Sequence, residues 1–148
     1  MAIKIVDMIK MANDVVGTTQ DTNEVPGAIR KVLMNGPKFH TWLHVYQNPG
    51  DHDEMHCHNA DQTFYCVEGE CTMYFKDDSA HVLKPGMVAL IPGGNFYWLE
   101  NTGESKMVLL GSRALSDEES QKIDFVTRKN VHAHKMGEPP KYTKILVD

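Results

Sequence analysis

The sequence has few cysteines, no long apolar run and no excess of basic residues, and each of these gaps removes a class of protein. Its only cysteines are Cys57, Cys66 and Cys71, an odd number without the C-x2-C spacing of common zinc sites. At least one thiol therefore stays free in a monomer, which is typical of the reducing cytoplasm and not of a disulfide scaffold. We interpret the three thiols as small buried hydrophobic groups.

Apolar runs are short, and acidic residues outnumber basic ones. The runs 87–91 and 107–110 are far below the roughly 20 residues of a membrane-spanning helix. Lys4, Asp7 and Lys10 interrupt the start of the chain, where a secretory signal needs an apolar region. Fifteen Lys and Arg against 20 Asp and Glu give a net charge of -5, which disfavours nucleic acid or an anionic membrane as a partner. We therefore expect a soluble, cytoplasmic protein with neither of those partners.

What is present fits one packed domain over residues 1–148. Hydrophobic residues make up 41% of the chain and charged residues 24%, so a core can form and disorder is disfavoured. Apolar spacing predicts an amphipathic helix over 3–16, and a sequence that resembles a capping box at 116–119 predicts a second helix over about 117–126. The tail that follows contains His132 and His134, which fit an exposed polar tail, a lid or a surface metal site.

Between the two helices the pattern is that of an all-β protein. Short β-prone runs alternate with Gly, Pro, Asn and Asp about every eight to twelve residues, which predicts an antiparallel sandwich or small barrel with its core at about 30–112. The runs expected to form strands are 30–34, 40–47, 53–58, 62–68, 71–76, 80–83, 88–91, 97–100 and 106–112.

The most informative stretch begins at Gly50 and contains His56 and His58. Residues two apart on a strand point to the same side, so these imidazoles project together and can share one metal ion. A turn over 59–61 lets the next strand begin at Gln62, which returns that side chain to the histidines.

At these positions the sequence resembles the cupin superfamily. The first motif of that family, G-x5-H-x-H-x3-4-E-x6-G, is matched by Gly50, His56, His58 and Gly69, with Gln62 in the place of Glu. The second motif, G-x5-P-x-G-x2-H-x3-N, is matched by Gly86, Pro92, Gly94 and Asn101, with Tyr97 in the place of His. The resemblance implies a cupin-type antiparallel jelly-roll barrel of six to eight strands, here with short helices at its N- and C-terminal ends. It also implies a divalent transition metal between the sheets, commonly Fe, Mn, Ni, Zn or Cu.

The two departures from the motifs bear directly on the chemistry. The resemblance assigns metal binding to His56, His58, Gln62 and Tyr97. The Gln62 carbonyl is a neutral donor, so the metal would keep more positive charge and act as a stronger Lewis acid. The Tyr97 phenol, with an ordinary pKa of about 10, must lose its proton to bind a metal well. Tyr97 is therefore either a ligand or a catalytic hydrogen-bond donor or general acid beside an open position. A barrel that has lost its metal is the alternative interpretation.

Strand alternation predicts which side chains line the pocket. In the run 39–46 we place Phe39, Leu43 and Val45 inward, and the aromatic set at His40, Trp42, His44 and Tyr46 outward. The opposite phase would bring His40 and His44 into the pocket. The expected pocket residues are Leu43, Val45, Phe64, Cys66, Met73, Phe75 and Leu99. This wall is mostly apolar and has no Arg or Lys cluster, so it favours a small, mostly apolar organic substrate over a phosphate or dicarboxylate. The outward aromatic face predicts a homodimer.

The predicted function is that of a metal-dependent cupin enzyme. Similarity to small single-domain cupins favours an Fe(II) dioxygenase, and Lewis-acid lyase or isomerase chemistry at the same metal is the alternative. A non-catalytic cupin that binds a small ligand is the rival from another class.

Overall fold

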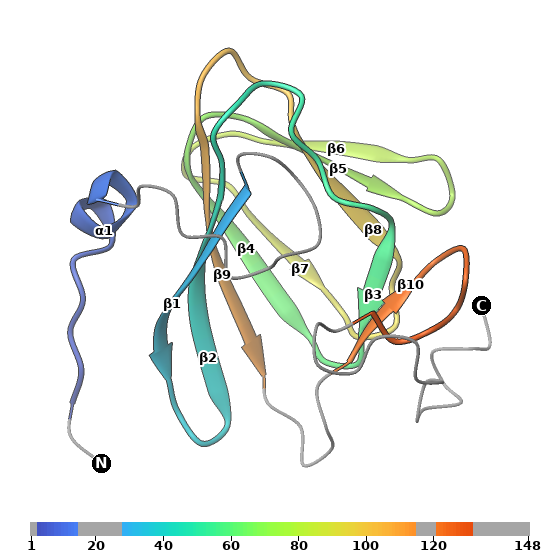
Figure 1. Cartoon of the computed structure of the whole chain (residues 1–148), viewed down its shortest axis with the longest axis horizontal. Helices are drawn as coiled ribbons and strands as arrows, with labels where there is room; N and C mark the ends of the chain where they lie inside the picture. The colour runs from blue at the N-terminus through green and yellow to red at the C-terminus, as the bar shows by residue number, and fades with distance from the viewer. Residues whose placement is uncertain (1–2, 15–27, 115–120, 132–148) are drawn as a thin grey trace.

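Two five-stranded antiparallel sheets face each other in the computed structural model of the chain, which describes residues 3–14, 28–114 and 121–131 (Figure 1). The first sheet contains, in order, β1 (Ala28–Asn35), β2 (Phe39–Tyr46), β9 (Met107–Ala114), β4 (Gln62–Glu68) and β7 (Val88–Ile91). The second contains β10 (Lys122–Asp124), β3 (His56–His58), β8 (Tyr97–Asn101), β5 (Cys71–Phe75) and β6 (Ala80–Leu83). The helix is α1 (Met8–Asp14). The predicted all-β, jelly-roll fold is confirmed.

The expected strands all form, although some of their ends differ. β4, β6 and β7 begin and end at the predicted residues, whereas β3 is limited to His56–His58. Consecutive strands alternate between the sheets at several points, so short crossing turns are needed. Gly69 makes one of them with a φ of 77°, and a Cβ there would lie 2.4 Å from the backbone oxygen of Lys106. Only glycine fits that turn.

The space between the sheets is filled by buried side chains, which we call the intersheet core. Both sheets contribute to it, so the two layers are held together by apolar burial. Its members from the first sheet are Trp42, Tyr46, Phe64, Cys66, Ile91, Met107 and Leu109, and those from the second are Cys71, Met73, Leu83, Tyr97 and Leu99. The three cysteines of the chain are all buried and free.

A second apolar cluster lies on the outer face of the first sheet, beneath α1 (Figure 1). The helix is shorter than the predicted 3–16, because the carboxylate of Asp7 accepts a hydrogen bond from the Lys10 backbone N–H at 2.9 Å and caps the helix at that point. Residues 3–7 precede the helix, and 15–16 lie outside the described residues. Ala12 is buried against the sheet, whereas Ile5 and Ile9, expected on the same face, are exposed.

The prediction of a C-terminal helix over 117–126 is wrong for the part of that range that the structure describes, which is 121–126. Residues 122–124 form β10, which pairs with β3 so that Ile123 lies opposite Cys57. Ile123 is fully buried in a third cluster with Cys57 and Phe96. This long-range packing and the pairing to an open strand edge outweigh the local helix signal at Ser116, which itself lies outside the described residues.

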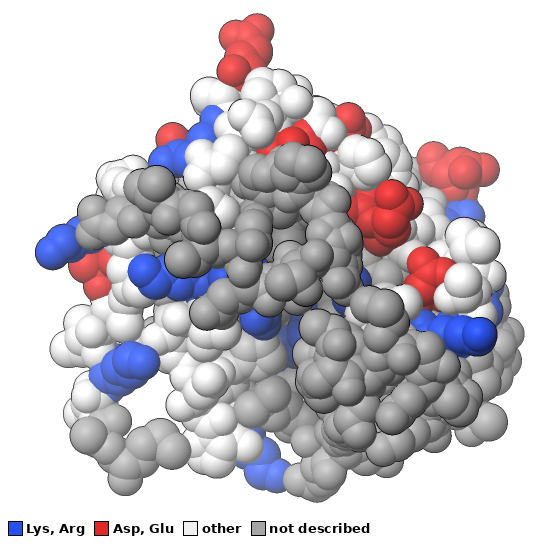
Figure 2. All heavy atoms as spheres, viewed as in Figure 1, with Lys and Arg blue, Asp and Glu red and all other residues white. Residues whose placement is uncertain are grey.

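Charge on the surface is mixed. On the face seen in Figure 2, acidic side chains gather toward the top and upper right, and the Lys and Arg side chains of the described residues stand apart from one another. Within residues 3–14, 28–114 and 121–131 the structure has no helix with the length and apolar character needed to cross a bilayer.

Candidate functional site

The two motif histidines meet inside the fold, as their spacing predicts. Both side chains project from β3 into the space between the sheets and are buried, while Cys57 between them faces the third cluster. Their ring centroids are 5.0 Å apart, and the ring of Tyr97 from the neighbouring β8 lies 4.7 Å from that of His56. Strand pairing fixes this arrangement, because His56 is directly opposite Tyr97 in the sheet.

Backbone carbonyls set the tautomer of both imidazoles. His56 Nδ1 lies 2.7 Å from the Glu54 carbonyl oxygen, and His58 Nδ1 lies 3.0 Å from that of Gln121. A carbonyl only accepts hydrogen bonds, so Nδ1 carries the proton in each ring and Nε2 carries the lone pair. Burial lowers the pKa of both rings well below the ordinary value of 6.5, and neighbouring cationic side chains add to this effect. Both imidazoles are therefore neutral near pH 7, the form that can bind a metal.

Gln62 and Tyr97 complete the set predicted from the motifs. The Gln62 amide N–H donates to the Tyr97 hydroxyl, so the Gln62 carbonyl oxygen points away from the phenol. Burial raises the pKa of Tyr97 above its ordinary value, although Arg113 opposes this shift. Tyr97 therefore keeps its proton near neutral pH, which favours a hydrogen-bond donor over a phenolate ligand.

Arg113 is the site residue that the sequence analysis missed. Its Nε and Nη2 donate to the Gln62 carbonyl oxygen at 3.1 and 3.0 Å, and Nη2 also lies 3.1 Å from His58 Nε2. The side chain is only 6% exposed. Since His58 Nε2 carries a lone pair, this last contact is an N–H donated by the guanidinium. The pocket was expected to have no cluster of Arg or Lys, and one buried arginine lies beside His58 and Gln62.

A packed aromatic ring holds this arginine. The guanidinium carbon of Arg113 lies 5.0 Å from the centre of the Trp42 ring, and that of Arg30 lies at the same distance. These are distances for cation–π contacts. Gly111 makes room for the indole, because a Cβ at this position would lie 2.3 Å from a ring atom of Trp42. Arg30 also contacts His40, whose pKa is lowered to about 4 by burial and then by Arg113 and Arg30.

Two further polar groups lie near the site, the partly buried Asp53 and the buried Tyr46. The Asp53 carboxylate accepts the Leu99 backbone N–H at 2.6 Å and lies 3.8 Å from His56 Nδ1, behind the imidazole. Burial raises the pKa of Asp53 to about 7. The hydroxyl of Tyr46 is buried and makes no hydrogen bond to a described residue.

The predicted phase of β2 is reversed in the structure. Leu43 and Val45 pack with Ala12 of α1 on the outer face of the first sheet, so they do not line the space around the histidines. Trp42 and Tyr46 face inward instead. β2 is buried on both faces, so hydrophobicity alone could not identify the inner one. The remaining predicted pocket residues are on the expected side: Phe64, Cys66, Met73 and Leu99 belong to the intersheet core, and Phe75 packs against it.

This reversal also bears on the expected homodimer. The aromatic side chains that were expected to form an outer subunit contact lie in the intersheet core or against it, with Trp42 and Tyr46 each 1% exposed. The homodimer stays a prediction, but that face no longer supports it.

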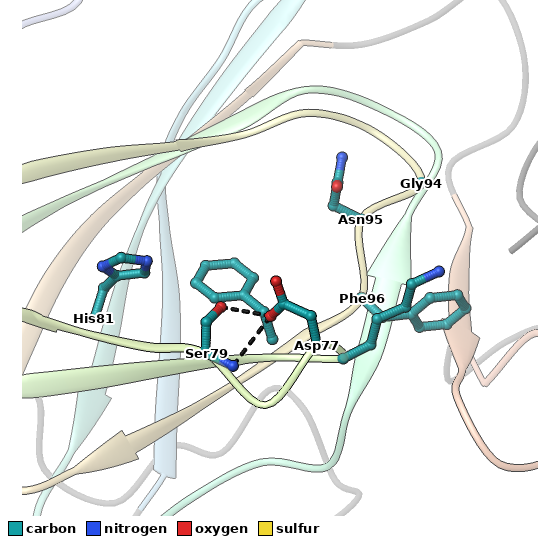
Figure 3. Close-up of a pocket in the computed structure, with 8 residues that line it drawn as sticks. Asp77, Ser79, His81, Gly94, Asn95 and Phe96 are labelled. Atoms are coloured by element: carbon teal, nitrogen blue, oxygen red, sulfur yellow. Dashed lines mark hydrogen bonds between the residues drawn. The ribbon is translucent and has the colours of Figure 1, made fainter.

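A separate pocket of about 320 Å³, lined by His81 and not by His56 or His58, lies between the β5–β6 turn and the loop before β8 (Figure 3). The Asp77 carboxylate accepts hydrogen bonds from the backbone N–H and the hydroxyl of Ser79 at its rim. Asn95 and Phe96 form the opposite side. Because Asp77 is engaged within its own turn, we assign this pocket no chemistry.

The donor atoms of the central site fit a divalent transition metal in type. Two neutral imidazoles and an amide oxygen are suitable ligands for such an ion, and carbonyl partners on Nδ1 are common for histidines that bind metals. No three His, Cys, Asp or Glu side chains gather as a metal-binding group within the described parts of the chain, so any site here depends on Gln62. Arg113 occupies the His58 lone pair and the Gln62 oxygen, so a metal would have to displace it.

Comparison with known proteins agrees with this fold. Residues 43–112 match the family model described as "Cupin domain", a match that covers less than half of the 148 residues. No curated protein matches the chain.

Solved structures show the same fold at low identity. A cupin-like protein from Thermotoga maritima superposes with a TM-score of 0.63 at 18% identity, over 80% of this chain and 90% of that one. A protein with a double-stranded β-helix domain from Klebsiella pneumoniae gives 0.59 at 18% identity, over 70% and 89%. The DMSP lyase DddQ from Ruegeria pomeroyi gives 0.56 at 14% identity, over 63% and 50%. At these identities the likeness concerns the fold alone.

Proposed function

We propose that this protein is a metal-dependent cupin enzyme that acts on a small organic molecule between its two sheets. His56, His58 and Gln62 would hold a divalent first-row metal. The observation that carries the proposal is the tautomer of the two imidazoles, because both Nδ1 atoms donate to backbone carbonyls and both Nε2 atoms carry a lone pair. A metal would take the His58 lone pair in place of Arg113.

The metal would supply Lewis-acid chemistry, by polarising an oxygen of a bound molecule. The other residues have distinct parts in this proposal. Tyr97 keeps its proton and accepts the Gln62 N–H, so its own O–H is available to donate to a bound molecule. The apolar side chains of Phe64 and Leu99 exclude water from this space. A protonated Tyr97 beside the proposed metal favours proton-transfer chemistry of the lyase or isomerase kind. The family resemblance predicts an Fe(II) dioxygenase instead, and a measurement of oxygen uptake tests that activity.

Arg113 favours a second candidate function. Its hydrogen bonds to His58 and Gln62 satisfy two of the proposed metal donors without a metal. A cupin that binds a small ligand and performs no reaction would be consistent with that arrangement.

Metal uptake separates the two functions. The purified chain is stripped with a chelator, reloaded with Zn²⁺, Mn²⁺ or Fe²⁺, and its metal content is measured. We expect about one ion per chain, with uptake lost in His56→Ala plus His58→Ala and kept in the matched control His52→Ala plus His81→Ala, whose imidazoles are exposed. A folded wild type that takes up none of these metals would refute the enzyme in this form and leave the binding module.

A further inference from the structure

The strand that carries the two motif histidines is paired to β8 irregularly. β3 and β8 pair at one position, where His56 lies opposite Tyr97. Contact resumes at an isolated bridge between His52 and Glu100. The chain advances by one residue more from His52 to His56 than it does from Tyr97 to Glu100, so an extra residue is accommodated just before β3. Such a bulge interrupts the ladder and leaves backbone groups that need other partners.

Asp53 bridges this interruption with its side chain. Its backbone N–H donates to the Leu99 carbonyl oxygen at 3.1 Å, as the N–H of a paired strand residue would. In return, the Leu99 N–H donates to the Asp53 carboxylate at 2.6 Å. Leu99 is fully buried, so its N–H needs such an acceptor. The carboxylate of Asp53 therefore takes the place of a strand carbonyl.

The carbonyl that this carboxylate replaces belongs to Glu54. With His56 opposite Tyr97, a regular antiparallel ladder would bring Glu54 opposite Leu99, two residues further along both strands. The Leu99 N–H and carbonyl both point toward this strand, so Glu54 would exchange hydrogen bonds with Leu99 there. In the structure the Glu54 carbonyl oxygen instead lies 2.7 Å from His56 Nδ1 and fixes the tautomer of that ring.

We infer that Asp53 is a positioning residue of the proposed metal site. By accepting the Leu99 N–H, its carboxylate releases the Glu54 carbonyl, which holds the proton of His56 on Nδ1 and leaves the lone pair on Nε2. The nearest approach of the carboxylate to His56 Nδ1 is 3.8 Å, too long for a hydrogen bond, so Asp53 acts through Glu54. The inference rests on the proposed function for its metal, but the hydrogen bonds themselves belong to the metal-free chain.

NMR tests this role in the metal-free full chain, because imidazole nitrogen chemical shifts report which nitrogen carries the proton. The shifts are measured in wild type, Asp53→Ala, Asp53→Asn and Asp51→Ala. Asp51→Ala is the matched control, because its carboxylate lies in the same loop but accepts hydrogen bonds from Asn48. His58 is the internal control, because its Nδ1 is paired with the Gln121 carbonyl. The melting temperature is measured on every sample.

Wild type should carry the proton on Nδ1 in both His56 and His58. In Asp53→Ala the Leu99 N–H loses its acceptor, and a buried N–H without a partner costs about 1–3 kcal/mol. The Glu54 carbonyl should turn to that N–H, so His56 should move its proton to Nε2 in a large fraction of molecules while His58 keeps its form. Asp53→Asn should behave like wild type, since the amide oxygen can still accept the Leu99 N–H.

Several outcomes would overturn the inference. An unchanged His56 tautomer in Asp53→Ala is one, and an equal change in His58 or in Asp51→Ala is another. Loss of the wild-type tautomer in Asp53→Asn is a third, because it would assign the effect to the charge of the carboxylate. If Asp53→Ala does not fold, Asp53→Ser takes its place under the same criteria, because the serine hydroxyl is one bond shorter and does not reach Leu99.

Metal binding separates the failure of this inference from failure of the proposed function. Asp53→Ala should bind Zn²⁺ about 10- to 100-fold more weakly than wild type, as is typical when a partner behind a metal ligand is removed. Asp53→Asn and Asp51→Ala should stay near wild type. A chain with the expected tautomers that takes up no metal would refute the proposed function and leave the role of Asp53 in orienting His56. Equal metal binding and an equal His56 tautomer in all variants would refute that role and leave the metal site.

Discussion

Replacing Arg113 with Met should tighten metal binding. The guanidinium makes three hydrogen bonds to His58 Nε2 and Gln62 Oε1, at 3.0 to 3.1 Å, and a metal must break at least the one to His58. A hydrogen bond that involves a charged group is worth about 1.5–3 kcal/mol. Removing this competitor should therefore raise the metal affinity by about ten- to a hundredfold.

Competition with a chromophoric chelator for Zn²⁺ measures this change directly. Wild type, Arg113→Met and the control Arg30→Met are titrated under the same conditions, and the control should shift much less. Without metal, Arg113→Met should also melt at a lower temperature, because His58 and Gln62 lose their donors. Added Zn²⁺ should recover part of that loss. An unchanged or weaker metal affinity in Arg113→Met would refute the idea that guanidinium and metal compete for the same lone pairs.

Two further predictions concern packing and pH. Gly111→Ala should destabilise the fold by about 1–3 kcal/mol in a denaturant titration, because its Cβ would lie 2.3 Å from the Trp42 ring; an unaffected midpoint would contradict that packing. The pKa of His40 is about 4 in the folded chain, below its ordinary value of 6.5. The unfolded state therefore binds more protons between these values, and the free energy of unfolding should fall as the pH drops from about 6.5 to 4. His40→Gln should lose less stability over this window than wild type, and equal losses in the two proteins would argue against a neutral, buried His40.

Local pattern was sufficient to predict most of the fold. Period-2 alternation and turn residues located the strands, and the spacing from Gly50 to Gly69 brought His56, His58 and Gln62 together. These signals are short-range, so they survive in the sequence without knowledge of the fold.

The failures arose where long-range packing decides. Leu43 and Trp42 are apolar neighbours on β2, a strand that is buried on both faces. Only the helix α1 that covers one face and the pairing of β2 with β9 show which of the two side chains faces the intersheet core. Ile123 becomes a strand residue through its pairing with β3, far away in the sequence.

Arg113 carried a weak signal of its own. In β9, Arg113 lies two positions after Gly111, so both residues face the same side of the sheet. A small residue at that position is compatible with an aromatic ring packed beside the arginine. Its contact with Gln62, however, depends on the register between β9 and β4. That register is set by the whole sheet and cannot be derived from the neighbouring residues.

The metal centre is tested most directly by X-ray absorption spectroscopy of the Zn²⁺-loaded chain. The proposal predicts nitrogen and oxygen ligands at about 2.0–2.2 Å with the scattering of two imidazoles, from His56 and His58. Sulfur should be absent from the coordination shell, because within the described parts of the chain no cysteine gathers with His56 and His58 into a metal-binding group. A sulfur ligand at about 2.3 Å, or a spectrum without imidazole scattering, would contradict a metal held between the sheets by these histidines.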